Sequence, residues 1–283
     1  MKFAFFTLGG YFFWEDIYNY QGWVIQHNVR NSKYRLLDKH NICRDSGTFE
    51  QCKTTLLKYI DAYELQPPYQ DTVIILHGFA HTKKSLAKLC ESLSELPANI
   101  VPLNYPSLRK GLKYHAKMLD QLIENLDIKG NLYIINVGTS CLITRQMIHN
   151  SANYRSYNIA GVLDINPSNS GSDLAELLTD KKIFNFILGP MLRDISTPRA
   201  VRLPRLPADI NHGIIFSSGI LRRTLKKHLA KFESITFDAP PTERSYAEKI
   251  KDLETSFLFS LKNQELFDEC KTFLTTGDFS DQE

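Results

Sequence analysis

The sequence has few of the patterns that mark metal, redox or nucleotide sites. Its 283 residues include five cysteines, an odd number, and none belongs to a Cys-x-x-Cys pair. This spacing signals neither a disulfide framework nor a zinc site, and it favours a reducing compartment. The sequence also lacks a glycine-rich phosphate loop, a metal-ligand spacing and an internal repeat. We therefore expect no metal site and no cofactor.

Strong charge and long apolar runs are missing as well. The formal net charge is +3, with a pI near 8.5, which is too small an excess to predict a nucleic acid partner. The apolar, aromatic residues 3–14 are fewer than the roughly 20 that span a membrane, and they lack the cleavage site of a secretory signal. A buried segment and an interfacial anchor both stay open for them. The expected location is the cytoplasm or the periphery of a membrane.

The chain is long enough, and at 43% hydrophobic apolar enough, to bury a full core with a small additional module. Residues 23–26 and 34–37 are strand-like and are joined by a turn-prone Asn31-Ser32. Ser46-Gly47-Thr48 then caps a helix. We expect a β-hairpin and one helix in residues 1–66, followed by a main domain in residues 67–283.

From Asp71 onward, strand and helix patterns alternate, which predicts a mostly parallel sheet flanked by helices. Residues 174–207 are irregular, rich in proline and arginine, and stand where a lid would be inserted. The expected strands are 72–76, 100–103, 132–135, 161–165 and 213–217, with a weaker one at 234–237. The expected helices are 85–96, 112–126, 142–149 and 261–274.

The centre of this pattern is the stretch 131–145, where an apolar strand meets a Gly-bearing turn and then a helix. The turn lies at the carboxyl end of its strand, which is where open α/β sheets place ligands and catalytic groups.

Four motifs together resemble the bacterial triacylglycerol-lipase-like members of the α/β-hydrolase superfamily, over residues 71–279. They are His77-Gly78-Phe79 after a strand, Asn104-Tyr105-Pro106-Ser107 after the next, the stretch 166–172, and the terminal segment 272–279. The resemblance implies an α/β-hydrolase fold from a bacterial source. It also implies an oxyanion hole and pocket formed by Gly78, Phe79, Thr139, Tyr105 and Asn166.

The positions of the catalytic triad depart from the family's pattern. When the nucleophile elbow is aligned without gaps, Leu142, Ile143 and Arg145 match the residues that follow it, and the nucleophile position falls on Gly138. The acid and base positions fall on Lys227 and Phe257, and no histidine follows His228. The resemblance therefore implies a pseudoenzyme, a lipase-like or esterase-like hydrolase body that binds a lipid-like or acyl molecule, a membrane surface or a protein.

An alternative register makes Ser140 the nucleophile of an active carboxylic-ester hydrolase, with a remote histidine such as His212 as its base. This register loses the second glycine of the motif and shortens the turn. The other candidates for chemistry are Asp164, His77, His115, Cys141 and the basic run 222–228, and each has a structural interpretation beside the functional one.

Two expectations can be compared directly with a structure. The gap-free alignment predicts a positive φ at Gly138, because the strand and helix around the turn are intact. It also predicts an apolar cleft over Gly138, bordered by Phe79, Phe257 and the 174–207 segment.

Overall fold

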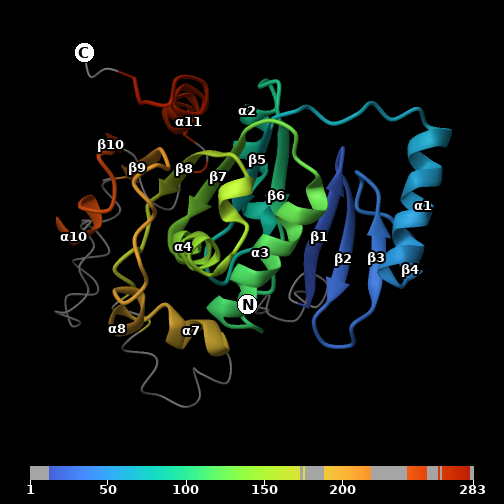
Figure 1. Cartoon of the computed structure of the whole chain (residues 1–283), viewed down its shortest axis with the longest axis horizontal. Helices are drawn as coiled ribbons and strands as arrows, with labels where there is room; N and C mark the ends of the chain where they lie inside the picture. The colour runs from blue at the N-terminus through green and yellow to red at the C-terminus, as the bar shows by residue number, and fades with distance from the viewer. Residues whose placement is uncertain are drawn as a thin grey trace, which may run out of the picture.

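The computed structural model describes residues 13–172, 175, 188–217, 241–253, 261 and 263–280. It contains a four-stranded antiparallel sheet, β1-β2-β3-β4, and a six-stranded sheet in the order β10-β9-β8-β7-β5-β6. Figure 1 shows the small sheet with helix α1 at one end of the molecule and β10 toward the other.

Every neighbouring pair in the six-stranded sheet is parallel, as the alternating pattern predicts. The strands are short, and the four inner ones, β5, β7, β8 and β9, are mostly buried, as expected of a sheet covered on both faces. They are β5 (Thr72–Leu76), β6 (Asn99–Leu103), β7 (Leu132–Val137), β8 (Ile159–Ile165), β9 (His212–Ser217) and β10 (Lys249–Leu253).

Helices cover both faces of this sheet. Alternate residues of a strand point to opposite faces, so Ile74 packs in a core with α3 (Leu112–Leu126) and α4 (Cys141–Asn150). Its neighbour Ile75 packs in a second core with α2 (Ala87–Leu93) and α11 (Gln264–Thr276). The predicted fold class is therefore confirmed.

The N-terminal module contains the predicted hairpin and helix, together with two strands that the sequence did not reveal. Strands β2 and β3 pair antiparallel, and Thr48 caps α1 by accepting a hydrogen bond from the Gln51 N–H at 3.2 Å. Strand β1 carries two acidic residues, and β4 reads as a turn, so neither shows a plain strand pattern. The bounds are β1 (Trp14–Tyr20), β2 (Trp23–Asn28), β3 (Tyr34–Leu37), β4 (Cys43–Gly47) and α1 (Phe49–Ala62).

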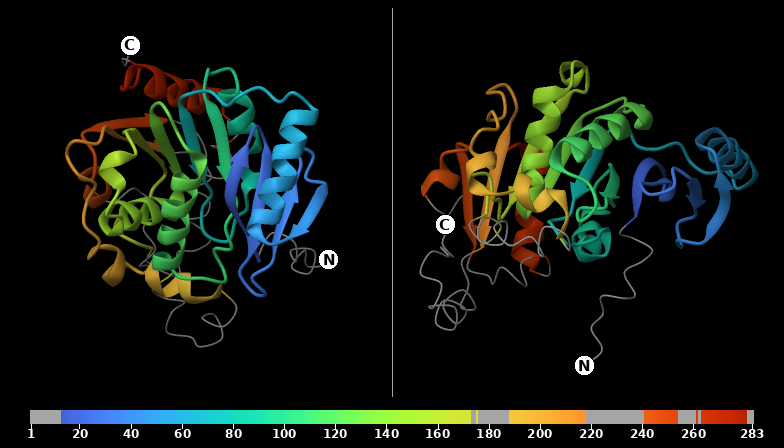
Figure 2. Two further views of the ribbon diagram at one scale, coloured as in Figure 1. Left: turned by 45° about the vertical axis from the view of Figure 1, so that its right-hand side comes forward. Right: turned by 90° about the horizontal axis from the view of Figure 1, so that it is seen from below.

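Strand β1 joins this module to the parallel sheet. The Asp16 N–H donates to the Asn104 carbonyl at 2.9 Å, and the Asn104 N–H donates to Asp16 Oδ2 at 3.0 Å, just beyond the end of β6. On α3, Tyr114 donates to Glu15 Oε1 at 2.8 Å and the Asn125 amide to the Ile17 carbonyl at 2.8 Å. Helix α1 lies on the outer side of the module, as Figure 2 shows.

Strand β10 is a correction to the sequence analysis, which placed no strand at 249–253. Its sequence, Lys-Ile-Lys-Asp-Leu, contains three charged residues and so lacks the apolar run of the inner strands. It pairs only with β9 within the described residues. An edge strand needs less apolar surface than a central one, and lysines are common there.

Several predicted features lie outside the described residues. They are Lys227, Phe257, the strand at 234–237, the basic run 222–228, residues 3–12 and much of the first half of the 174–207 segment. The second half of that segment contains α7 (Pro190–Asp194) and α8 (Thr197–Ala200), and α10 (Pro241–Arg244) follows later in the chain. Among the helices described, none has the length and apolar character needed to cross a membrane.

Candidate functional site at the turn after β7

The turn after β7 has the backbone that the gap-free alignment predicts. Gly138 has a φ of +61°, in the left-handed region that favours glycine. A short 3₁₀ turn, η3 (Gly138–Ser140), leads directly from the strand into α4. The prediction of a positive φ at Gly138 is thus confirmed.

The space beside Gly138 is open. A Cβ atom built on this residue would meet nothing closer than the Gly78 Cα, at 4.0 Å. A Cβ atom would therefore fit without a clash against the described residues. Crowding does not explain the glycine here, although the positive φ still favours it.

The loop after β5 packs tightly against this turn. A Cβ at Gly78 would come within 3.2 Å of the Val137 carbonyl oxygen. His77 is fully buried and stacks on Tyr105, with ring centroids 4.1 Å apart and an interplanar angle of 6°. Burial lowers the pKa of His77 to about 4, so the ring is neutral at physiological pH. His77 and Tyr105 form a packed support beneath the loop.

The Phe79 N–H, the expected oxyanion-hole donor, is already bonded to the protein. It donates to Thr139 Oγ1 across the turn, at 3.3 Å. Thr139 directly follows the predicted nucleophile position. Because its hydroxyl accepts the Phe79 N–H, that N–H is not free to donate to an oxyanion. The assignment of Gly78, Phe79, Thr139, Tyr105 and Asn166 to an oxyanion hole and pocket stays a prediction.

Ser140 lies beneath the turn. Its side chain is fully buried, and its oxygen accepts a hydrogen bond from the Val137 N–H at 2.8 Å. The hydroxyl can donate to the carbonyl oxygen of Leu76, at 3.2 Å, or of Val137, at 3.0 Å. These bonds tie the turn to the ends of two strands and give the hydroxyl a structural role.

A buried polar network lies below α4. Asp164 of β8 accepts hydrogen bonds from Asn136 at 2.8 Å and from Asn169 at 3.2 Å, and it pairs with His212 Nε2 at 3.0 Å. Burial alone would raise the pKa of Asp164, but the charge and hydrogen bond of His212, with the two amides, lower it below its usual value. Asp164 is therefore a carboxylate at neutral pH.

Both ring nitrogens of His212 face acceptors. Nε2 meets the Asp164 carboxylate, and Nδ1 lies 3.1 Å from the Tyr246 carbonyl oxygen. Neither nitrogen is left to act as a base for Ser140 in this arrangement.

The same network holds the loop 166–172. Glu243 of α10 accepts hydrogen bonds from the N–H groups of Asn169, at 2.8 Å, and Ser170. Arg145 of α4 donates to the Asn169 carbonyl at 2.8 Å and to the Pro204 carbonyl at 3.0 Å. Burial raises the pKa of Glu243, although the two N–H groups oppose that shift. Sequence reasoning missed Glu243, which is far from the loop in the sequence and stands beside no motif.

The remaining candidates are placed as follows. Cys141 is buried, and burial raises the pKa of its thiol well above its usual value, which leaves it unreactive. His115 is buried, and burial lowers its pKa to about 3. Asn166 bridges the ends of β8 and β9 by accepting from the Ser217 N–H at 2.7 Å. Within the described parts of the chain, no cluster of histidine, cysteine and carboxylate side chains could hold a metal ion.

Two cavities that are lined by described residues lie away from Gly138. One lies beside Asn158 and Asp209 at the amino ends of the strands, and the other beside Gly189 and Arg193. Phe257 and much of the first half of the 174–207 segment are not described. The apolar cleft over Gly138 therefore stays a prediction.

Comparison with known proteins identifies the fold. No family model matches the sequence, and no curated protein matches it. Among solved structures, the propeptide form of the Bacillus licheniformis lipase BlEst2 aligns with a TM-score of 0.54 and 10% identity, over 76% of this chain and 52% of that one. The chain has the α/β-hydrolase fold. The strand–glycine turn–helix at β7 has the local backbone expected of that fold's nucleophile elbow, and its assignment as an elbow stays a prediction.

Two further α/β-hydrolase structures are similar over shorter stretches. A metagenomic carboxyl esterase, MGS0156, aligns with a TM-score of 0.48 and 14% identity over 57% of this chain. The phospholipase PlaB from Legionella pneumophila, in complex with thio-NAD, aligns with a TM-score of 0.46 and 19% identity over 54% of this chain. The alignments span only 55% and 39% of those two proteins.

Proposed function

We propose that this chain is a catalytically inactive relative of lipases and esterases that binds a lipid-like ligand at the carboxyl ends of its parallel strands. The observation that carries the proposal is Gly138, which has the elbow backbone and no side chain at the nucleophile position. Without a nucleophilic side chain at this position, no group can attack the ester carbonyl to form the covalent intermediate.

Three contacts support the loss of chemistry. The Thr139 hydroxyl accepts the Phe79 N–H, so an incoming oxyanion would have to displace it. The Ser140 oxygen is bonded to the Val137 N–H below the turn. Both nitrogens of His212 are bonded elsewhere. The alternative of an active ester hydrolase that uses Ser140 requires all three arrangements to change.

Ester hydrolysis tests the inactive state. We expect the wild-type protein, Ser140→Ala and the exposed control Ser94→Ala to hydrolyse 4-nitrophenyl butyrate at the same low rate. The background could reach about 10³-fold over water, as in hydrolases whose triad has been deleted. A wild-type rate that falls at least tenfold in Ser140→Ala alone would favour the active hydrolase. Intact-mass analysis after fluorophosphonate treatment, with no adduct expected, gives an independent readout.

Ligand binding tests the second half of the proposal. We expect decanoate to bind the full-length protein in calorimetry, because apolar acyl chains suit a water-excluding pocket. Phe79→Asp, which places a charge beside the elbow, should weaken that binding at least tenfold. Tyr69→Asp, at a tyrosine that is 56% exposed, should leave it unchanged. Equal binding by both variants, or none by the wild type, would refute a lipid-like ligand and favour a protein partner.

A further inference from the structure

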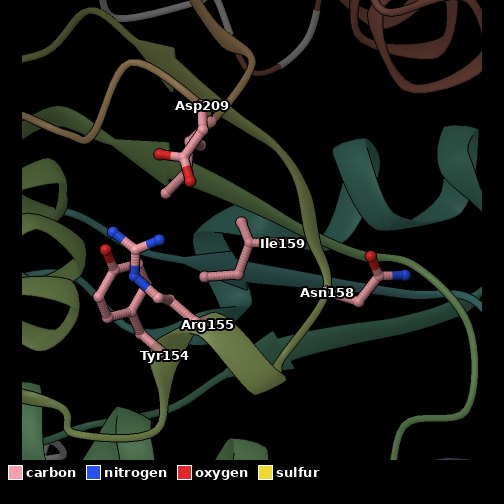
Figure 3. Close-up of a pocket in the computed structure, with 6 residues that line it drawn as sticks. Tyr154, Arg155, Asn158, Ile159 and Asp209 are labelled. Atoms are coloured by element: carbon pink, nitrogen blue, oxygen red, sulfur yellow. The ribbon is translucent and has the colours of Figure 1, made fainter.

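A pocket lies at the amino ends of the parallel strands, away from the turn at Gly138. It has a volume of about 240 Å³ and is lined by residues at the amino ends of two strands. Ile159 begins β8, and Asp209 and Ile210 precede β9. Figure 3 shows that Tyr154 and Arg155, from the turn before β8, form the opposite wall.

Two opposite charges face each other across this pocket. In Figure 3, the guanidinium of Arg155 and the carboxylate of Asp209 point toward one another. Within the described part of the chain neither group forms an ion pair, so the two charges stand apart. The Tyr154 ring lies against the guanidinium, 5.4 Å from its centroid, and helps to fix its direction.

The rest of the lining is one polar residue, Asn158, and two isoleucines, and hydrogen bonds hold parts of it in place. Ile159 and Ile210 supply the apolar surface, and the Ile210 N–H donates to the Pro207 carbonyl at 3.1 Å. Asn158 is fixed by hydrogen bonds from its amide to Gly130 O at 3.3 Å and to Asn131 Oδ1 at 3.0 Å. A wall fixed before binding lowers the entropy that binding costs.

We propose that this pocket binds a small zwitterion of the α-amino-acid class. Its carboxylate faces Arg155, its ammonium group faces Asp209, and an aliphatic side chain rests on the two isoleucines. A singly charged ligand would pair with one wall and leave the other charge without its complement. The volume is below the roughly 300 to 1,000 Å³ of pockets for drug-sized molecules, which fits a molecule of this size.

Leucine is the probe for the test, measured with the full-length protein by saturation-transfer NMR and calorimetry. We expect a millimolar dissociation constant, because the pocket is open to water and both charged residues are exposed. N-acetyl-leucine lacks the ammonium group and 3-methylbutylamine lacks the carboxylate. Each should bind the wild-type protein at least tenfold more weakly than leucine does.

Two variants make the test specific for charge. Arg155→Gln should weaken leucine at least tenfold and leave 3-methylbutylamine unchanged. Asp209→Asn should weaken leucine and remove the preference for leucine over N-acetyl-leucine. Arg202→Gln, an exposed arginine outside the pocket, is the matched control and should bind like the wild type.

The proposal is overturned if leucine does not bind at millimolar concentration, or if its binding is unaffected by both pocket variants. Thermal unfolding of each variant confirms that the fold is kept, as expected for exposed substitutions. The pocket lies at the amino ends of the strands and Gly138 at the carboxyl end of β7, so this result and the ester assay are independent.

Discussion

The elbow and the polar network beneath α4 lie side by side and have opposite characters. The turn at Gly138, the predicted elbow, has a left-handed backbone but carries no reactive group there. The network is rich in ionisable groups, yet Asp164, His212 and Glu243 are all bonded within the protein. The comparison teaches that a glycine turn with positive φ and a buried ionisable pair are separate signs, and that neither alone indicates catalysis.

The largest expected effect comes from breaking the network. Asp164→Ala removes the carboxylate and leaves His212, Asn136 and Asn169 without their acceptor in a buried site. We expect the free energy of unfolding to fall by about 3–5 kcal/mol, measured by urea denaturation. Asp252→Asn, which breaks the exposed Arg244–Asp252 pair, is the control and should cost less than about 1 kcal/mol. A loss below about 1 kcal/mol in Asp164→Ala would mean that the network contributes little to stability.

The network should also make stability depend on acid. The pKa of Asp164 is lower in the folded protein than its usual value, so the pair stabilises the fold above the unfolded pKa. This contribution is lost as the pH falls from about 4 through the folded pKa. Asp164→Asn should flatten the decline in unfolding free energy between pH 6 and pH 3. An unchanged slope in that variant would assign the acid sensitivity to other carboxylates, such as Glu269.

A smaller effect is expected at the elbow. Gly138→Ala and Gly138→Ser should each cost about 1–2 kcal/mol, because a side chain disfavours the positive φ while the space around it is open. Gly189→Ala is a useful contrast, since its Cβ would clash with the Leu108 carbonyl oxygen, and it should cost more. If Gly138→Ser is much more costly than Gly138→Ala, the space over the elbow is not open.

The smallest expected effect is that of Ser140→Ala. Loss of the hydroxyl leaves the Val137 N–H without its acceptor, which should lower the unfolding free energy by about 1 kcal/mol. Thermal unfolding measures this loss, with Ser94→Ala as the exposed control. An effect on stability without an effect on ester hydrolysis would sharpen the comparison, because it would make Ser140 a support of the elbow.

The parallel sheet could be predicted from the sequence, because short apolar runs such as those in β5 and β7, alternating with helical patterns, are typical of buried parallel strands. It also located the turn at Gly138 and predicted its positive φ. It did not predict β10 or β1, whose charged residues find partners that are distant in the chain, such as Glu269 for Lys251 and Asn104 for Asp16. The polar network was missed for the same reason. Asn136 looks like an isolated polar residue in an apolar strand until β8 lies beside it and brings Asp164 within hydrogen-bond distance.

The edges of the parallel sheet have a consequence for the behaviour of the protein in concentrated solution. An open strand edge invites a second chain to continue the sheet. At one edge, Pro102 in β6 has no N–H to offer, and Asp16 of the N-terminal module occupies the backbone of Asn104. At the other, Lys249 and Lys251 of β10 pair with Asp278 and Glu269, which holds the C-terminal segment against that strand. Removing the N-terminal module would uncover the first edge, so a chain that starts at Asp71 should aggregate at concentrations where the full-length protein stays dispersed.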